Sequence, residues 1–168
     1  PSGRDICNLK TTYADTIRDV DDFVASLTTE LDAFDPVFAL HADHGEAFGE
    51  HGHFKHPGYL FQEHTHVPCL VWNVREKRRL QKPFSLQQLP KLFEEIAQPE
   101  TEIDWDDYAD ETALSTTDVN GSAVTSDSWK IYHQPNDTVF FDLSSDPDET
   151  QPQSVLDNHL DSLSRKAE

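Results

Sequence analysis

The stretch VFALHADHGE, residues 37–46, carries the most information about the fold. Its first six residues form an apolar run of strand length, and such runs are typical of parallel strands that are covered on both faces. The run ends at Asp43 and His44, which would lie at the carboxyl end of the strand. Ligands bind at that edge of an open α/β sheet, so the stretch predicts a buried strand and a functional site together.

A helix is predicted before this strand, over residues 11–34. Apolar residues recur there at steps of three and four, which is the helical period: Tyr13, Ile17, Val20, Val24, Leu27 and Leu31. Asp35-Pro36 ends the helix, because the residue before a proline avoids helical geometry. A helix, a short break and a buried strand together indicate an α/β unit.

The chain beyond this strand predicts further helices and strands. Residues 67–72 are predicted to form a second buried strand, and residues 85–96 a helix. From residue 121 the pattern changes to short strands, and a hairpin is predicted between residues 129–132 and 138–143. The predicted fold class is therefore α/β, with a partial, mostly parallel sheet flanked by helices and a small C-terminal antiparallel hairpin subdomain.

Three segments are predicted from these patterns. Residues 1–97 belong to the α/β part, and residues 121–168 form the small antiparallel subdomain with a closing helix. Residues 98–120, which are acidic and rich in turn formers, are predicted to be an exposed loop or linker.

The composition excludes several classes of function. The 168 residues include 13 basic and 32 acidic side chains, a formal charge of −19. A protein that binds nucleic acid or anionic lipid needs clustered Lys and Arg, so neither partner is expected. Three Trp and ten Phe favour a folded chain over a disordered one. The acid excess then predicts a halophilic protein, and an ordinary acidic protein with a solvated face is the alternative.

No apolar run approaches the roughly 20 residues of a membrane helix, and no signal peptide is visible. These features favour a soluble, cytoplasmic protein. The chain begins at Pro1 and contains no Met, so we expect it to be part of a longer polypeptide.

Seven of the nine histidines lie between residues 41 and 66. Among them, Asp43 and His44 place a carboxylate oxygen beside an imidazole nitrogen, and this pair is the predicted ligand set for a divalent metal. Oxygen ligands suit calcium, magnesium or manganese, whereas an imidazole shifts the preference towards manganese or zinc. Glu46 and Glu50 either bond the loop backbone, orient a histidine, or are exposed to solvent.

The residues around this pair resemble a known family. The second metal-binding segment of sulfatases, in the alkaline phosphatase superfamily, is similar to DHGE at 43–46, FGEHG at 48–52, His56 and HVP at 66–68. The strands after residue 121 are similar to the C-terminal hairpin of the same family. The resemblance covers most of residues 11–150 and implies an alkaline-phosphatase-like fold and metal-dependent hydrolysis of a small anionic sulfate ester.

The resemblance also implies roles for three residues. Asp43 and His44 would bind the cation, usually calcium in that family. His56 would contact the charged oxygens of the substrate or protonate the leaving group. The adjacent Lys55 is predicted to contact the substrate from its place in the histidine-rich loop, although Gly is commoner at that position in the family. His44 stands where Asn is common, as in the branches that hydrolyse phosphodiesters and phosphonates. A phosphodiesterase or phosphonate hydrolase is therefore an alternative.

The nucleophile of sulfatases lies in a C/S-x-P-x-R motif, and the chain contains neither this motif nor the first, Asp-rich metal segment. We therefore expect the chain to be the C-terminal portion of a sulfatase, inactive without a complementary N-terminal segment. A noncatalytic remnant or binding module is the alternative from another functional class.

Overall fold

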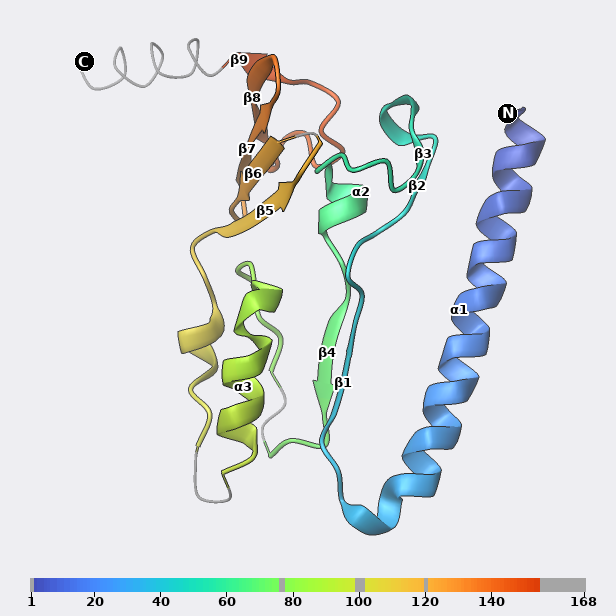
Figure 1. The fold of residues 1–168 in the computed structure, drawn as a ribbon, viewed down its shortest axis with the longest axis vertical. Helices are drawn as coiled ribbons and strands as arrows, with labels where there is room; N and C mark the ends of the chain where they lie inside the picture. The colour runs from blue at the N-terminus through green and yellow to red at the C-terminus, as the bar shows by residue number, and fades with distance from the viewer. Residues whose placement is uncertain (1, 76–77, 99–101, 120, 155–168) are drawn as a thin grey trace. The chain divides into compact units, whose positions relative to one another are not determined.

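The computed structural model describes residues 2–75, 78–98, 102–119 and 121–154. The chain divides into two compact units. Unit 1 contains the described residues within 1–57 and 67–77, and unit 2 contains those within 58–66 and 78–168. Figure 1 shows the helices and strands of both units.

Unit 1 begins with the long helix α1, Gly3–Leu31, followed by the 3-10 turn η1, Asp32–Phe34. The predicted helix is confirmed, but it starts eight residues earlier than expected. Ser2 caps it: its side chain accepts from the backbone N–H of Asp5, and the Asp5 carboxylate accepts from the backbone N–H of Ser2. This reciprocal pair satisfies two helix-end donors and explains the earlier start.

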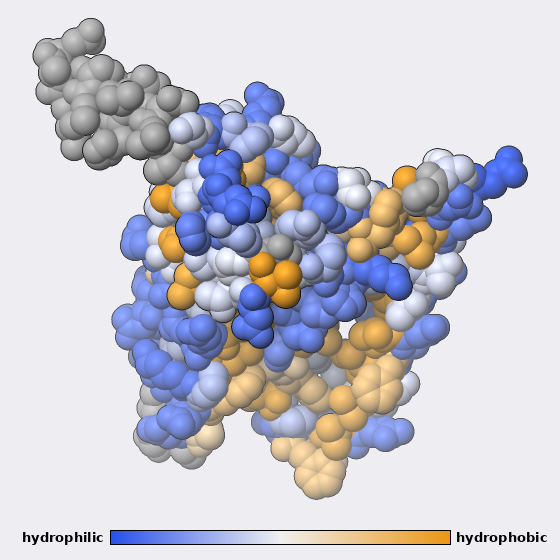
Figure 2. Space-filling model, turned by 45° about the horizontal axis from the view of Figure 1, so that its top comes forward, coloured by the Kyte–Doolittle hydropathy of each residue, from blue (hydrophilic) through white to orange (hydrophobic). Residues whose placement is uncertain are grey.

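No residue of α1 is buried: the first half of its apolar stripe is exposed, and the second half, from Val24 to Leu31, is half-buried. Hydrophobic surface is visible among hydrophilic surface in Figure 2. The large exposed apolar residues of unit 1 are Leu9, Tyr13, Ile17, Val20, Phe23, Phe34, Val37 and Leu70. Within the described residues, no helix combines the length and the apolar character that a bilayer span requires.

The two predicted strands are present as β1, Phe38–His41, and β4, Cys69–Trp72, but the prediction that they are buried is wrong, since their residues are exposed or half-buried. They pair antiparallel, with Phe38 opposite Trp72 and His41 opposite Cys69, so the predicted mostly parallel sheet is wrong. Every strand pairing among the described residues is antiparallel. The predicted direction failed because an apolar run does not fix the direction of the partner strand. Residues of β1 alternate between half-buried and exposed, as a sheet with one covered face requires.

The described residues of unit 2 form four short helical elements. These are α2, Gln62–Thr65, the 3-10 turn η3, Leu86–Gln88, α3, Leu89–Ile96, and the 3-10 turn η4, Trp105–Tyr108. Elements η3 and α3 together fall within the predicted helix 85–96. Pro90 lies in the first turn of α3, where proline is tolerated because its missing N–H has no helical partner.

Unit 2 also contains a five-stranded antiparallel sheet in the order β5-β6-β7-β8-β9. Its strands are β5, Ala113–Thr117, β6, Gly121–Thr125, β7, Trp129–Gln134, β8, Asp137–Asp142, and β9, Gln153–Ser154. The predicted hairpin is confirmed as β7 and β8. Strand β5 falls within the segment 98–120, which was expected to be loop. The predicted closing helix lies outside the described residues.

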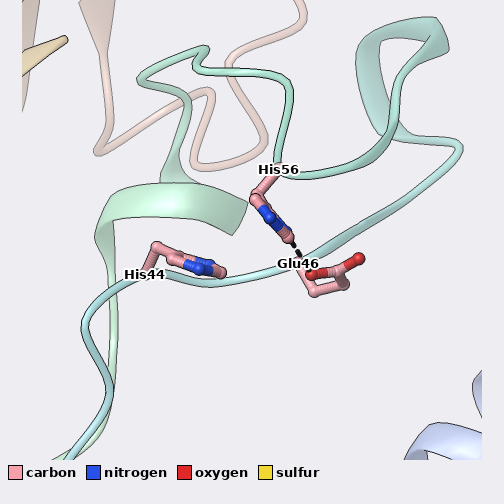
Figure 3. A group of neighbouring side chains, drawn as sticks. All are labelled: His44, Glu46 and His56. Carbon is pink, nitrogen blue, oxygen red and sulfur yellow. Dashed lines mark hydrogen bonds and ion pairs between the residues drawn. The ribbon is translucent and has the colours of Figure 1, made fainter.

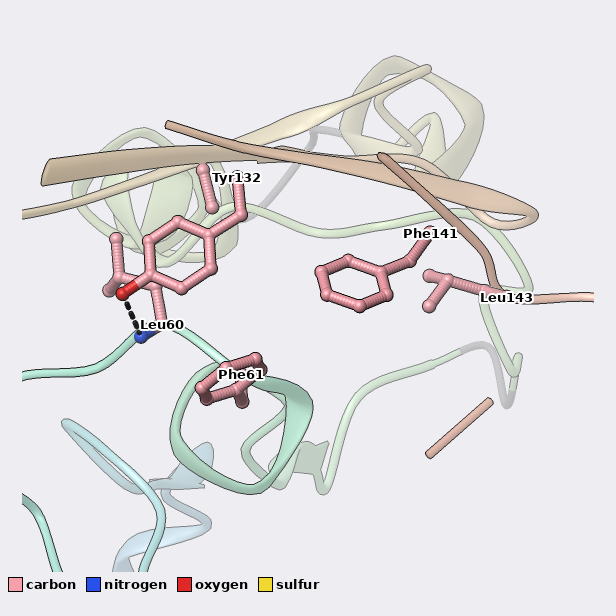
Figure 4. Close-up of a cluster of buried hydrophobic side chains, with 6 residues drawn as sticks. Leu60, Phe61, Tyr132, Phe141 and Leu143 are labelled. Carbon is pink, nitrogen blue, oxygen red and sulfur yellow. Dashed lines mark hydrogen bonds between the residues drawn. The ribbon is translucent and has the colours of Figure 1, made fainter. Parts of the chain in front are cut away.

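The core of unit 2 forms where α2 and its preceding residues meet the sheet (Figure 4). Phe61 packs edge-to-face on Tyr132, with ring centroids 5.5 Å apart. The Tyr132 hydroxyl accepts a hydrogen bond from the backbone N–H of Leu60 at 3.3 Å, which satisfies a polar atom inside the core. The buried members are Leu60, Phe61, Ala123, Tyr132, Phe141 and Leu143.

Replacing Gly121 by alanine should destabilise unit 2 by about 1–3 kcal/mol. Gly121 has a φ of +95°, and a Cβ there would lie 1.9 Å from the carbonyl oxygen of His133 on β7. Denaturant unfolding of the Gly121→Ala protein measures the loss. Gly3→Ala is the control, because a Cβ at Gly3 meets no atom within 4 Å. Equal stability of the two variants would contradict the β6–β7 register.

Candidate metal centre

Asp43 and His44 form the bend that follows β1, with Ala42 between them and the last paired residue, His41. The backbone N–H of Ala42 still donates to the carbonyl of Pro68 at 3.3 Å, so the strand holds the chain up to the residue before Asp43. The Asp43 side chain is 87% exposed, and its Oδ1 accepts from the backbone N–H of His44 at 3.0 Å. The carboxylate is thus held locally and remains open to solvent.

The orientation of the His44 ring is set by its own loop. Nδ1 lies 2.9 Å from the carbonyl oxygen of Gly45. A carbonyl oxygen only accepts, so Nδ1 carries the proton and Nε2 presents its lone pair in the neutral ring. Nε2 lies 3.8 Å from Oδ1 of Asp43. A metal-binding histidine commonly donates its other ring N–H in this way.

Glu46 and His56 are brought together by a short ladder. Strand β2, Ala47–Phe48, pairs antiparallel with β3, Phe54–Lys55, and places Ala47 opposite Lys55. Glu46 precedes one strand and His56 follows the other, so both lie at the same end of the ladder. Nδ1 of His56 lies 3.1 Å from Oε2 of Glu46 (Figure 3).

The ring of His44 lies beside the ring of His56, with centroids 4.2 Å apart and planes inclined by 32° (Figure 3). His44, Glu46 and His56 each offer one ligand atom, and these three atoms lie within 4.8 Å of one another. Among the described residues, no other three His, Cys, Asp or Glu side chains lie close enough together to hold one metal ion. We call these three residues the His44–Glu46–His56 group.

From the sequence, Glu46 could bond the loop backbone, orient a histidine or be exposed to solvent. In the structure its carboxylate contacts His56, which agrees with the second of these roles. The sequence signal was the short spacing within the DHGE stretch, but the partner, ten residues away, is visible only after the ladder is formed.

Glu50 fixes the loop to α1 instead. The 3-10 turn η2, Glu50–Gly52, separates β2 from β3. The Glu50 carboxylate accepts from the backbone N–H of Phe48 and from Nζ of Lys10 at 3.0 Å. Burial opposes ionisation, but the backbone N–H groups of Glu50 and Phe48 and the charge of Lys10 together lower the pKa of Glu50. The carboxylate therefore stays charged and anchors the loop.

Two further contacts hold the same loop. Tyr13 of α1 packs edge-to-face on Phe48, with centroids 5.0 Å apart. Gly49 has a φ of +116°, and a Cβ there would lie 3.3 Å from the ring of Phe54. Glycine suits this position because it adopts a positive φ without strain and has no Cβ to contact Phe54. The backbone that carries the His44–Glu46–His56 group is therefore packed rather than loose.

Lys55 lies in β3 beside His56, exposed, with a φ of +65°. A lysine in the left-handed region is uncommon and indicates a locally constrained backbone. Its position next to His56 is as the sequence indicated, but its side chain is not part of the His44–Glu46–His56 group.

The donor set can be compared with the needs of each metal. Asp43 and His44 supply one carboxylate and one imidazole, whereas calcium takes about six to eight oxygen ligands. These two residues fit part of a calcium site and would need oxygen ligands from elsewhere. The His44–Glu46–His56 group offers a different set, with two nitrogens and one carboxylate.

A family model described as Sulfatase matches residues 3–104, which is more than half of the chain. The matched region includes α1, both strands of the β1–β4 ladder and the whole candidate metal centre. A search of curated proteins and a search of solved structures each found no match.

Proposed function

The chain belongs to the sulfatase family of hydrolases, and we propose from this premise that it supplies the cation-binding and substrate-contacting part of an enzyme that cleaves sulfate esters. The observation that carries the proposal is the position of Asp43 and His44. They form the bend that follows β1 within the matched region, with an exposed carboxylate and a His44 Nε2 lone pair.

In this proposal Asp43 and His44 contribute to the binding of one divalent cation, with calcium as the cation expected and manganese, magnesium or zinc as alternatives. A bound cation supplies positive charge that favours the anionic ester and its transition state. Because calcium needs more oxygens than these residues offer, further ligands come from outside the described residues.

The proposed role of His56 follows from its contact with Glu46. Nδ1 faces the Glu46 carboxylate, so Nε2 is the atom that would contact a substrate oxygen. In the protonated ring, Nε2 carries the proton that a leaving alkoxide needs, and the Glu46 carboxylate stabilises that charge. Lys55 adds a second positive charge beside it.

We further propose that a complementary N-terminal segment of the same enzyme supplies the nucleophile and the remaining metal ligands. The 168 residues contain no C/S-x-P-x-R motif, and without an activated nucleophile no covalent step takes place. The exposed apolar side chains of unit 1 support this proposal, since large apolar patches mark surfaces that bind a partner. By itself the chain would be inactive.

A second candidate function is hydrolysis of phosphodiesters or phosphonates. It is favoured by the imidazole at His44, in the position where sulfatases commonly carry Asn. The two functions share the same proposed cation pair and differ in the group transferred.

Substrate assays separate these candidates. The chain is expressed together with the segment encoded upstream of it, and rates are measured on an aryl sulfate and on the matching aryl phosphodiester. We expect calcium-dependent hydrolysis with a preference for the sulfate, and no hydrolysis by the chain alone. A preference for the phosphodiester would support the second candidate. An upstream region without a nucleophile motif, or hydrolysis by the chain alone, would contradict the proposal.

A further inference from the structure

We propose that the His44–Glu46–His56 group is a cation site of a second kind, which takes zinc or a similar transition metal rather than calcium. The proposal deepens the function described above, and it rests on that function only for the competition between zinc and calcium. The group shares only His44 with the proposed calcium pair: it adds Glu46 and His56 and does not include Asp43.

The chemistry of the donors selects the metal. Two imidazole nitrogens and one glutamate oxygen form a ligand set that catalytic zinc sites use, with the fourth position open to water. Calcium is a hard cation that prefers oxygen, so two nitrogens in a set of three disfavour it. Asp43 is the residue that distinguishes the two sites, because it does not belong to the group.

The geometry is close to what zinc requires. Ligand atoms in a tetrahedral zinc site lie roughly 3.3 Å apart, given bond lengths of about 2.0–2.2 Å. Those of the group lie within 4.8 Å. The side chains of His44, Glu46 and His56 are 44%, 24% and 56% exposed, so each can rotate by the small amount needed and a metal can enter from solvent.

Two features indicate that this proximity is built by the fold. Glu46 and His56 flank the paired ends of β2 and β3, so their backbones are held together by the ladder. His44 donates from Nδ1 to Gly45, and that bond leaves Nε2 as the ligand atom without any change of tautomer. A second partner that orients the ring in this way is typical of metal-binding histidines.

The proposed site has a consequence for regulation. Zinc bound there would occupy His44, which the proposed calcium site also uses, and His56, which is proposed to contact substrate. Zinc and calcium would therefore exclude each other, and zinc would inhibit hydrolysis by the assembled enzyme.

The test is a metal titration of the purified chain after treatment with a chelator. Cobalt(II) serves as the probe because a site of nitrogen and oxygen ligands with low coordination number gives it visible absorption. We expect one cobalt ion per chain with such a spectrum, and its displacement by an equivalent of zinc. X-ray absorption at the zinc edge should then report two imidazole ligands.

Variants locate the site. Loss of an orienting partner typically weakens metal binding by about 10–100-fold, so Glu46→Gln and His56→Ala, which remove ligands, should each weaken it by at least about 100-fold. His133→Ala, an exposed histidine of β7 in unit 2, is the matched control and should leave zinc affinity unchanged. Circular dichroism checks that each variant folds. Zinc binding that is insensitive to Glu46→Gln and His56→Ala, or the absence of binding, would overturn the proposal.

Asp43→Ala separates this inference from the proposed function. Zinc binding should survive that substitution, because Asp43 is not a member of the group. If zinc binds to the group but the assembled enzyme hydrolyses no ester, the proposed function fails and the zinc site stands. If zinc does not bind but calcium-dependent hydrolysis requires Asp43, the reverse is true.

Discussion

Replacing Lys130 by methionine should destabilise unit 2 by about 3–5 kcal/mol. Lys130 of β7 and Glu149 form an ion pair with Nζ and Oε1 2.8 Å apart, and both side chains are 0% exposed. The other carboxylate oxygen of Glu149 accepts from the backbone N–H of Gln62 at 2.6 Å. Removing the lysine leaves a buried carboxylate without its counter-charge, and that is costly in a low-dielectric interior.

Electrostatics support this expectation. Burial lowers the pKa of Lys130 and raises the pKa of Glu149, and the attraction between the two charges opposes both shifts. Without Lys130 that opposition is lost, and the pKa of Glu149 rises further above its value in the unfolded chain. The loss of stability caused by Lys130→Met should therefore become smaller as the pH falls, because a protonated carboxyl is easier to bury than a charged one.

Denaturant unfolding followed by tryptophan fluorescence in a Trp72→Phe background measures the effect, because the remaining Trp105 and Trp129 both lie in unit 2. The control is Lys82→Met, which removes an exposed ion pair with Glu111 and should have a much smaller effect, because solvent screens that pair. The double variant Lys130→Met with Glu149→Gln should recover part of the loss, because the charge is gone and an acceptor for Gln62 remains. Equal effects of Lys130→Met and Lys82→Met would contradict this account of the pair.

Replacing Asp43 by alanine should reduce calcium-dependent hydrolysis by the assembled enzyme by about 100- to 1,000-fold, a cost typical of losing one electrostatic contact in an active site. The side chain is 87% exposed, so its loss should leave the fold and its stability intact. Rates on an aryl sulfate, with and without a calcium chelator, give the measurement.

Asp19→Ala is the matched control for this prediction, since Asp19 is exposed on α1 and lies outside the candidate metal centre. Its activity and calcium dependence should equal those of the unaltered enzyme. His44→Asn, which installs the residue common in sulfatases, should retain calcium-dependent activity while losing the zinc site. An Asp43→Ala enzyme with full, chelator-sensitive activity would show that the cation binds elsewhere.

The positions of most elements could be predicted from the sequence, but their pairing could not. Periodicity placed the helix before Asp35, and apolar runs placed the two strands within two residues of β1 and β4. The runs do not encode strand direction, and the predicted parallel sheet is wrong for that reason. Strand β5 was missed because the acidic, turn-rich composition of residues 98–120 outweighed the short alternation inside it.

For the candidate site too, the sequence predicted local features but not contacts between distant residues. Asp43 and His44 stood out because they follow an apolar run, and local sequence is enough to see that. The contact between Glu46 and His56 needs the β2–β3 ladder, and the pair Lys130–Glu149 joins residues that no short motif connects. Contacts between distant residues depend on the fold, so they could not be found from local patterns.

The most direct test of the central claim is a crystal structure of the assembled enzyme grown with calcium. We predict a calcium ion with an Asp43 carboxylate oxygen about 2.3–2.6 Å away, in contact with His44 and completed by oxygens of the upstream segment. A calcium ion bound away from both side chains, with Asp43 and His44 facing only solvent, would contradict the account.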